Sequence, residues 1–181
     1  MDKPRVATVF LAGCFGCHMS FLDIDERLEQ LVELVDLNKS PLTDIKTFTQ
    51  RCRIGLIEGG CANEENVHVL QQLREHCDIL VSVGECAIQG DIPSMRNTVP
   101  LRECLEEAYC YGQSVYKPSA GIPDDTELPL LLNRVTPCHE VVHIDWFLPG
   151  CPARSGAIWE ALTALLEDRP VRLPYNLLKY D

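Results

Sequence analysis

Short apolar runs alternate with amphipathic stretches along this chain. The apolar runs have the length of buried strands. We expect strands at Val6–Leu11, Ile54–Ile57, Ile79–Val83 and Val141–Ile144. Between them, apolar residues recur at helical spacing, and this pattern predicts helices at Phe21–Leu34, Glu64–His76, Leu101–Tyr111 and Ser155–Leu166. Asn63 and Ser155 have the side chains of N-terminal caps for the second and the fourth of these helices.

Strands and helices that alternate through short turns are typical of an α/β protein. We therefore expect a parallel sheet with helices on both faces, in a single domain that spans residues 1–181. In such a sheet, ligands bind at the carboxyl ends of the strands, near the point where the strand order reverses. Two parts of the chain lack a regular pattern, a long segment at about 109–140 and a tail from about 169. Each is interpreted either as a solvated loop or as a surface that docks a partner.

The composition is that of a folded protein, since 46% of the 181 residues are hydrophobic and 24% are charged. The formal net charge of −11 leaves no basic footprint for nucleic acid or anionic lipid. The first residues lack the features of a secretion signal, and no apolar run approaches the roughly 18 residues of a membrane span. We therefore expect a cytoplasmic protein with no membrane span and no nucleic-acid partner.

Ten cysteines are the most unusual part of the composition. An extracellular disulfide framework is disfavoured, because nothing directs secretion and the domain is large enough to fold without cross-links. Half of the cysteines follow predicted strands, at Cys14, Cys17, Cys61, Cys86 and Cys151. Because parallel strands end at one edge of a sheet, these five compete for one site there. The others are expected to pack as small hydrophobic residues or to lie in loops, at Cys52, Cys77, Cys104, Cys110 and Cys138.

The sequence around each cysteine narrows the choice of ligands. Cys14 and Cys17 form a C-x-x-C pair, whose sulfurs can lie on one side of a helical turn. Glycines flank Cys86 in the run GECAIQG, and Cys151 lies in the run PGCP, so the backbone can approach a bulky inorganic group closely. Thiolates favour soft metals and iron–sulfur clusters. Cys14, Cys17, Cys86 and Cys151 are therefore a good set of four ligands, with Cys61 close behind.

Other chemistries stay open on the residues alone. Zinc also accepts four thiolates, although structural zinc ribbons use two C-x-x-C pairs and this chain has one. A redox dithiol needs only Cys14 and Cys17 and leaves the other loops unexplained. The loop after the first strand has no Ser or Thr before Ser20, which disfavours FMN there. FMN elsewhere on the fold stays possible.

Four motifs in this order resemble those of the small subunits of nickel–iron hydrogenases, above all the short subunit of the cytoplasmic, bidirectional, NAD-linked type. They are Cys14-x-Gly16-Cys17 with Ser20, Glu58-Gly59, Gly84-x-Cys86-Ala87 and Pro149-Gly150-Cys151-Pro152. The resemblance covers most of the chain and implies a flavodoxin-like fold. It also implies that one 4Fe–4S cluster, the one nearest the active site, is held by Cys14, Cys17, Cys86 and Cys151. The nickel–iron site would then lie in a separate large subunit, and electrons would pass between it and NAD(P)-reducing diaphorase subunits that carry iron–sulfur clusters and flavin.

The chain departs from the pattern of that family in places that matter. Pro152-Ala153 stands where the family often has two prolines, and residue 181 ends the sequence before any C-terminal domain with further clusters, so we expect one cluster. Related subunits of respiratory complex I are the alternative within this class, but they have adjacent cysteines in the first motif, and the spaced pair here favours a hydrogenase. The resemblance makes Glu58 a candidate for tuning the cluster or relaying a proton; a solvated acid at a strand end is the alternative. His18 is a candidate for a hydrogen bond to a cluster sulfur.

Overall fold

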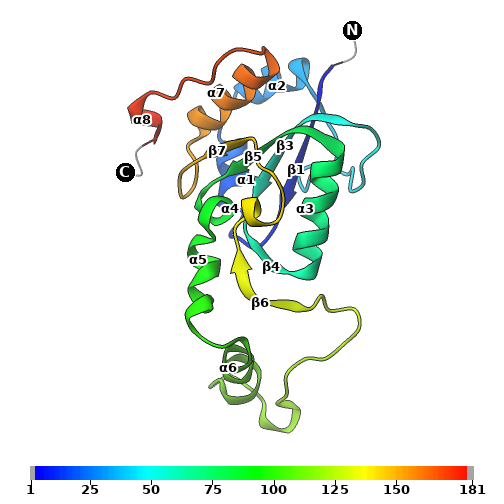
Figure 1. Cartoon of the computed structure of the whole chain (residues 1–181), viewed down its shortest axis with the longest axis vertical. Coiled ribbons are helices and arrows are strands. Elements are labelled where there is room, and N and C mark those ends of the chain that lie inside the picture. Colours follow the sequence, from blue (N-terminus) through cyan, green and yellow to red (C-terminus); the bar gives the residue numbers. More distant parts are fainter. Residues whose placement is uncertain (1–2, 179–181) are drawn as a thin grey trace.

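A five-stranded sheet forms the centre of the computed structural model, which describes residues 3–178 (Figure 1). Its strands are β1 Arg5–Phe10, β2 Asp36–Leu37, β3 Cys52–Glu58, β5 Cys77–Val83 and β7 Trp146–Leu148. All neighbours are parallel, in the order β2-β1-β3-β5-β7. Counted within this sheet alone, the order is 2-1-3-4-5, which is that of flavodoxin-like folds. The predicted α/β class with a parallel sheet is confirmed.

Helices cover both faces of this sheet (Figure 1). One face packs against α1 Gly16–Leu22, α2 Arg27–Leu34 and α7 Ser155–Leu166. The other packs against α3 Glu64–His76 and α4 Glu85–Gln89. The shorter helical turns are α5 Asp91–Ser94, η1 Met95–Thr98, α6 Leu101–Glu106, η2 Glu107–Tyr111, η3 Lys117–Ser119, η4 Cys138–Glu140 and α8 Tyr175–Leu178. Within residues 3–178, no helix is both long and apolar enough to cross a membrane.

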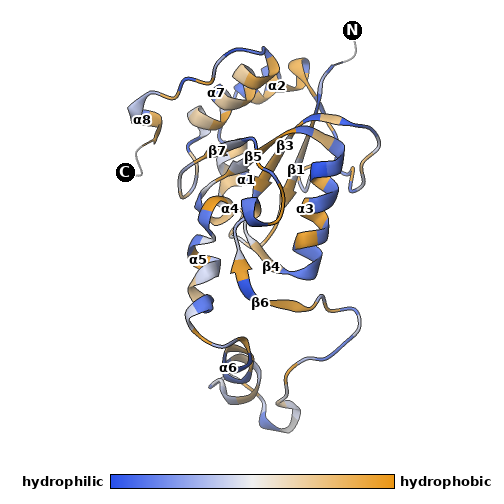
Figure 2. Cartoon of the chain, in the orientation of Figure 1, coloured by the Kyte–Doolittle hydropathy of each residue, from blue (hydrophilic) through white to orange (hydrophobic). Residues whose placement is uncertain are grey.

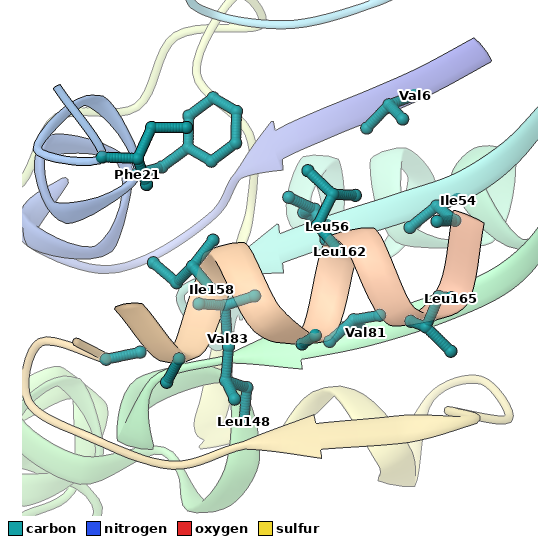
Figure 3. Packing of buried hydrophobic residues seen from close by; sticks show 14 of the residues in the cluster. Val6, Phe21, Ile54, Leu56, Val81, Val83, Leu148, Ile158, Leu162 and Leu165 are labelled. Carbon is teal, nitrogen blue, oxygen red and sulfur yellow. The ribbon is translucent and has the colours of Figure 1, made fainter. Parts of the chain in front are cut away.

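The two hydrophobic cores follow from the alternation of side chains along the strands. On β1, Val6 belongs to one core, whereas Ala7 and Val9 belong to the other. Figure 3 shows Ile158 and Leu162 of α7 facing the strands of the first core. Burying one such side chain stabilises the fold by about 1.5–3 kcal/mol. Figure 2 shows the contrast with α3, whose surface alternates between hydrophobic and hydrophilic residues because only one side of it packs.

A second, smaller sheet pairs β4 Cys61–Asn63 with β6 Leu131–Thr136 in antiparallel fashion. Strand β6 lies inside the segment that the sequence left without a pattern. The predicted cap of α3 is confirmed, because the Asn63 side chain accepts a hydrogen bond from the backbone N–H of Asn66 at 2.8 Å.

One predicted strand is wrong. Residues Val141–Ile144 lie in the turn between η4 and β7, and the parallel strand is β7 itself. The turn is closed by the Val142 N–H, which donates to the Cys138 carbonyl at 3.1 Å. Asp145 then ties the chain to β5, because its carboxylate accepts the backbone N–H of Leu80 at 2.8 Å. Apolar residues alone could not separate this packed turn from a strand.

Three helices differ from the prediction at their ends. The helix expected at Phe21–Leu34 is replaced by α1 and α2, with a turn between them in which Asp25 has a φ of 62°. The helix expected at Leu101–Tyr111 is α-helical only as far as Glu106 and continues as the wider turn η2. Ser155 is the first residue of α7 rather than its cap; Arg154 holds the cap position, without a capping side-chain hydrogen bond.

Candidate metal centre

The carboxyl edge of the main sheet brings four cysteines together from three loops. Cys14 lies in the loop after β1 and Cys17 in the first turn of α1. Cys86 is the second residue of α4, after β5, and Cys151 follows β7. The strand order reverses at β1, between β2 and β3, so this edge is where sheets of this type bind their ligands.

The loop that carries Cys14 and Cys17 is held by aromatic packing. Phe15, between them, has a φ of 67°, a conformation that residues other than glycine rarely adopt. Its ring stacks on His18, with the centroids 4.6 Å apart, and meets the edge of Phe10 at 5.1 Å. These contacts stabilise the strained residue that turns both thiols toward the edge.

Glycines make room for the sulfurs. Gly84 has a φ of 83°, and a Cβ there would collide with the Cys17 sulfur. Gly150 has a φ of 137°, and a Cβ would lie 2.5 Å from the Ala153 backbone. The N–H of Gly16 donates to the Cys14 sulfur at 3.3 Å. Larger residues at the first two positions would displace the loops that carry the cysteines.

The electrostatics show that the four thiols share one neighbourhood. Burial, together with the charges of Glu58, Cys86 and Cys14, raises the pKa of Cys17 to about 12. Burial, together with the charges of Asp91, Cys151 and Cys14, raises the pKa of Cys86 to about 11. Cys14 and Cys151 are exposed, whereas the other two are half-buried. The Cys17 and Cys86 thiols therefore hold their protons until a metal displaces them.

The spacing of these thiols bears on what they could hold. Among residues 3–178, no three His, Cys, Asp or Glu side chains surround one point closely enough to hold a single metal ion. A zinc ion needs every sulfur about 2.3 Å from its centre. A cluster takes its thiolates at separate iron atoms, so its ligands stand farther apart.

Glu58 lies at the end of β3 and is buried, with 3% of its surface exposed. Its carboxylate accepts the backbone N–H of Cys17 at 3.1 Å and that of His18 at 2.8 Å. The same carboxylate lies 2.6 Å from Nδ1 of His18. The alternative of a solvated strand-end acid is therefore wrong.

His18 is buried together with Glu58 rather than facing solvent. Its Nε2 lies 3.0 Å from the Thr8 hydroxyl, which in turn lies 2.7 Å from the hydroxyl of Ser40. Both ring nitrogens thus have partners within the chain. The result is a buried hydrogen-bonded row that fixes the Cys17 loop to β1, β3 and the segment after β2.

Cys61 stands apart from the four. It is fully buried in the second core, where a hydrogen bond with Cys138 and burial raise the pKa of Cys138 above its usual range. Cys52 and Cys77 form a similar pair, since they are register partners on β3 and β5. We call Cys61–Cys138 and Cys52–Cys77 the buried thiol pairs. They pack as small hydrophobic residues.

Some contributors to the site have little sequence signal. Asp91, at the start of α5, hydrogen-bonds the Cys151 thiol and, after burial, is the main cause that raises the pKa of that thiol. Ser20 donates to the Ala153 carbonyl at 2.5 Å and so anchors α1 to the loop of Cys151. Ser20 belongs to the first sequence motif, whereas nothing in the sequence indicates the contact between Asp91 and Cys151. Thr8 and Ser40 resemble any buried hydroxyl residues in the sequence.

Comparison with known proteins identifies the family. Residues 14–165 match the family described as NADH ubiquinone oxidoreductase, 20 Kd subunit. The chain is 48% identical over 180 residues to the delta subunit of the NAD-reducing hydrogenase HoxS of Cupriavidus necator. This alignment covers 99% of this chain and 86% of that subunit. The chain belongs to the 20 Kd subunit family. Within this family, its resemblance to the small subunit of the NAD-linked nickel–iron hydrogenase is confirmed.

Comparison with solved structures agrees with this family assignment. A chain of an NAD⁺-reducing nickel–iron hydrogenase, crystallised in the H2-reduced state, superposes with a TM-score of 0.95 and 49% identity, covering 99% of this chain and 100% of that one. The actinobacterial-type nickel–iron hydrogenase of Ralstonia eutropha H16 shares only the fold, with a TM-score of 0.60 and 14% identity over 98% of this chain and 58% of the other. Among relatives in sequence, a subunit of the F420-non-reducing hydrogenase of Methanothermobacter thermautotrophicus is 35% identical over 96% of this chain, which spans 56% of that relative's length.

Proposed function

We propose that this chain is the electron-transfer subunit of an NAD-linked nickel–iron hydrogenase and that it holds one 4Fe–4S cluster through Cys14, Cys17, Cys86 and Cys151. The observation that carries the proposal is the convergence of these thiols, from three loops, on the ligand-binding edge of the sheet. The donor set fits, because four cysteine thiolates are the usual ligands of such a cluster. When bound, the cluster supplies a site that takes up and releases single electrons.

Glu58 acts as a positioning residue in this proposal. It fixes the backbone of Cys17 and His18, and its charge is felt at the Cys17 thiol. Negative charge near a cluster favours the oxidised state, so Glu58 would lower the reduction potential. The short contact between Glu58 and Nδ1 of His18 can also hold a proton, which gives the relay role a structural basis.

The partners follow from the relatives. The matching relatives are named as an NAD-reducing hydrogenase subunit and a chain of an NAD⁺-reducing nickel–iron hydrogenase. We therefore infer a nickel-binding large subunit, which would contain the hydrogen-activating site, and diaphorase subunits that carry iron–sulfur clusters and flavin. Cys14 and Cys151 are exposed at the edge where such a partner would approach. All ten cysteines are free, which suits the reducing cytoplasm.

The test is metal analysis and electron paramagnetic resonance of the chain purified without oxygen. We expect about four iron and four sulfide per chain and a signal that appears on reduction. Zinc without iron would support the zinc-site alternative, and the absence of both would support the dithiol. Either result refutes the cluster.

Separate serine variants test the choice of ligands. Cys86→Ser is expected to remove most of the iron, whereas Cys61→Ser should keep it, because Cys61 lies in the second core. Cys104→Ser, on α6, is the matched control for the substitution itself. Loss of iron in Cys61→Ser with circular dichroism unchanged would overturn the assignment.

A further inference from the structure

A long part of the chain stands away from both cores, except for Leu132 near its end, which packs against the second core. We define the arm as residues 91–133, which run through α5, η1 and α6 and return into β6. Figure 1 shows α6 and the loop after it at the end of the molecule farthest from α2 and α7. Of the side chains that the structure describes in the arm, none is buried. A segment of this length without a core of its own needs another surface to cover it.

The base of the arm is nevertheless fixed in place. Arg96 donates to the carbonyls of Leu132 at 2.8 Å and Ala62 at 3.2 Å. Asn97 both donates to the Val135 carbonyl and accepts its N–H, at 2.8 and 2.7 Å. These side-chain bonds complete one edge of the small sheet. The arm is therefore presented in a defined orientation.

Large apolar and aromatic side chains point outward along the arm. The most exposed are Ile92 at 65%, Met95 at 70%, Tyr111 at 66%, Tyr116 at 73% and Leu130 at 67%. Tyrosine and methionine are enriched in protein interfaces, and side chains this exposed contribute little to the fold of the chain itself. The arm thus exposes apolar side chains of the kinds that interfaces bury.

The charges of the arm indicate whether a second copy of this chain or a different protein would cover it. The arm carries seven acidic and three basic residues. The basic ones already have partners within the arm or at its base: Arg96 binds carbonyls, Arg102 pairs with Glu106, and Lys117 donates to the Cys110 carbonyl. A second copy of this chain would bring the same acidic surplus and a net charge of −11, so that like charges would face each other.

We propose that the arm docks a different protein subunit, one that presents apolar side chains together with lysine and arginine. This inference rests on the proposed function, which places the chain among other subunits. Acidic side chains of the arm that meet basic ones of the partner would guide association and make its rate sensitive to salt.

The experiment measures binding of the cluster-loaded chain to the nickel-binding subunit and to the diaphorase subunits, each separately, at low and high salt. Met95→Ser tests the exposed apolar side chains, and Asp124→Lys with Asp125→Lys tests the acidic ones. Val32→Ser is the matched control, because Val32 is 51% exposed on α2, at the other end of the molecule. Iron content and the thermal midpoint verify that each variant is intact.

We expect Met95→Ser and the lysine variant each to raise the Kd for one of these subunits at least tenfold, with a weaker salt dependence in the lysine variant. Val32→Ser should stay within twofold. Unchanged binding by both arm variants would refute the docking role. So would self-association of the wild-type chain that Met95→Ser abolishes. A chain that holds its cluster and binds a subunit equally well in the wild type and in both arm variants overturns the docking proposal alone, whereas a chain that holds no cluster or binds none of the subunits overturns the proposed function.

Discussion

Replacing Glu58 by glutamine tests the buried network that supports the proposed cluster loop. The carboxylate accepts three N–H groups, two through one oxygen and one through the other. The amide oxygen of glutamine can keep the two bonds on the side of His18, but its NH2 group then faces the N–H of Cys17 with no acceptor. A buried donor left without a partner costs about 1–3 kcal/mol. The loss of one charge-assisted bond lies in the same range.

The expected destabilisation of the metal-free chain is thus about 2 kcal/mol, which for a protein of this size corresponds to roughly 4–8 °C in thermal midpoint. Urea unfolding followed by circular dichroism measures it, and Glu58→Ala should cost more because all three donors lose their partner. Glu33→Gln on exposed α2 is the control and should stay within about 0.5 kcal/mol. A Glu58→Gln variant as stable as the wild type would show that the carboxylate does not fix the loop.

Three further predictions follow from single features. Gly84→Ala should lower iron content while leaving far-ultraviolet circular dichroism intact, because the new methyl group would collide with the Cys17 sulfur and the φ of 83° disfavours it; normal iron loading would contradict this. The Arg169 guanidinium, at 2.6 and 2.9 Å, holds the pKa of Glu160 below its ordinary 4.5, so this contribution to stability is present above that value and lost as pH falls through the lowered pKa. Glu160→Gln should therefore flatten the acid side of the stability profile, as followed by urea unfolding. Alkylation read by mass spectrometry should modify Cys14 and Cys151 of the metal-free chain long before the buried thiol pairs, and equal rates would mean that the burial is wrong.

The sequence predicts the positions of the candidate cysteine ligands better than the structure of the segments around them. Residues that follow a strand are constrained by the strand itself, so the positions of Cys14 and Cys86 could be read once β1 and β5 were recognised. Cys151 lies at the predicted edge of the sheet, although the strand before it is β7 and not Val141–Ile144. The error was harmless because the true strand, β7, lies between that segment and the cysteine.

What the sequence could not show depends on contacts between distant residues. Cys61 follows β3 as closely as Cys86 follows β5, and only the packing against Cys138 sends its side chain into the second core. Glu58 could equally have been solvated. Its burial depends on His18 and Thr8, which belong to other elements and carry no local signal of their role.

The position of Glu58 links the fold to the chemistry proposed for it. The residue ends β3, the strand next to the point where the strand order reverses, and its carboxylate binds the loop that follows β1. The two strands that create the ligand-binding edge are therefore joined at that edge by a buried charge. A neutral residue could also connect the two strands at this edge, but it would not satisfy three N–H donors. It would also leave the electrostatic potential at Cys17 unchanged. A carboxylate does both, so the feature that orders the loop also acts on any electron carrier held there.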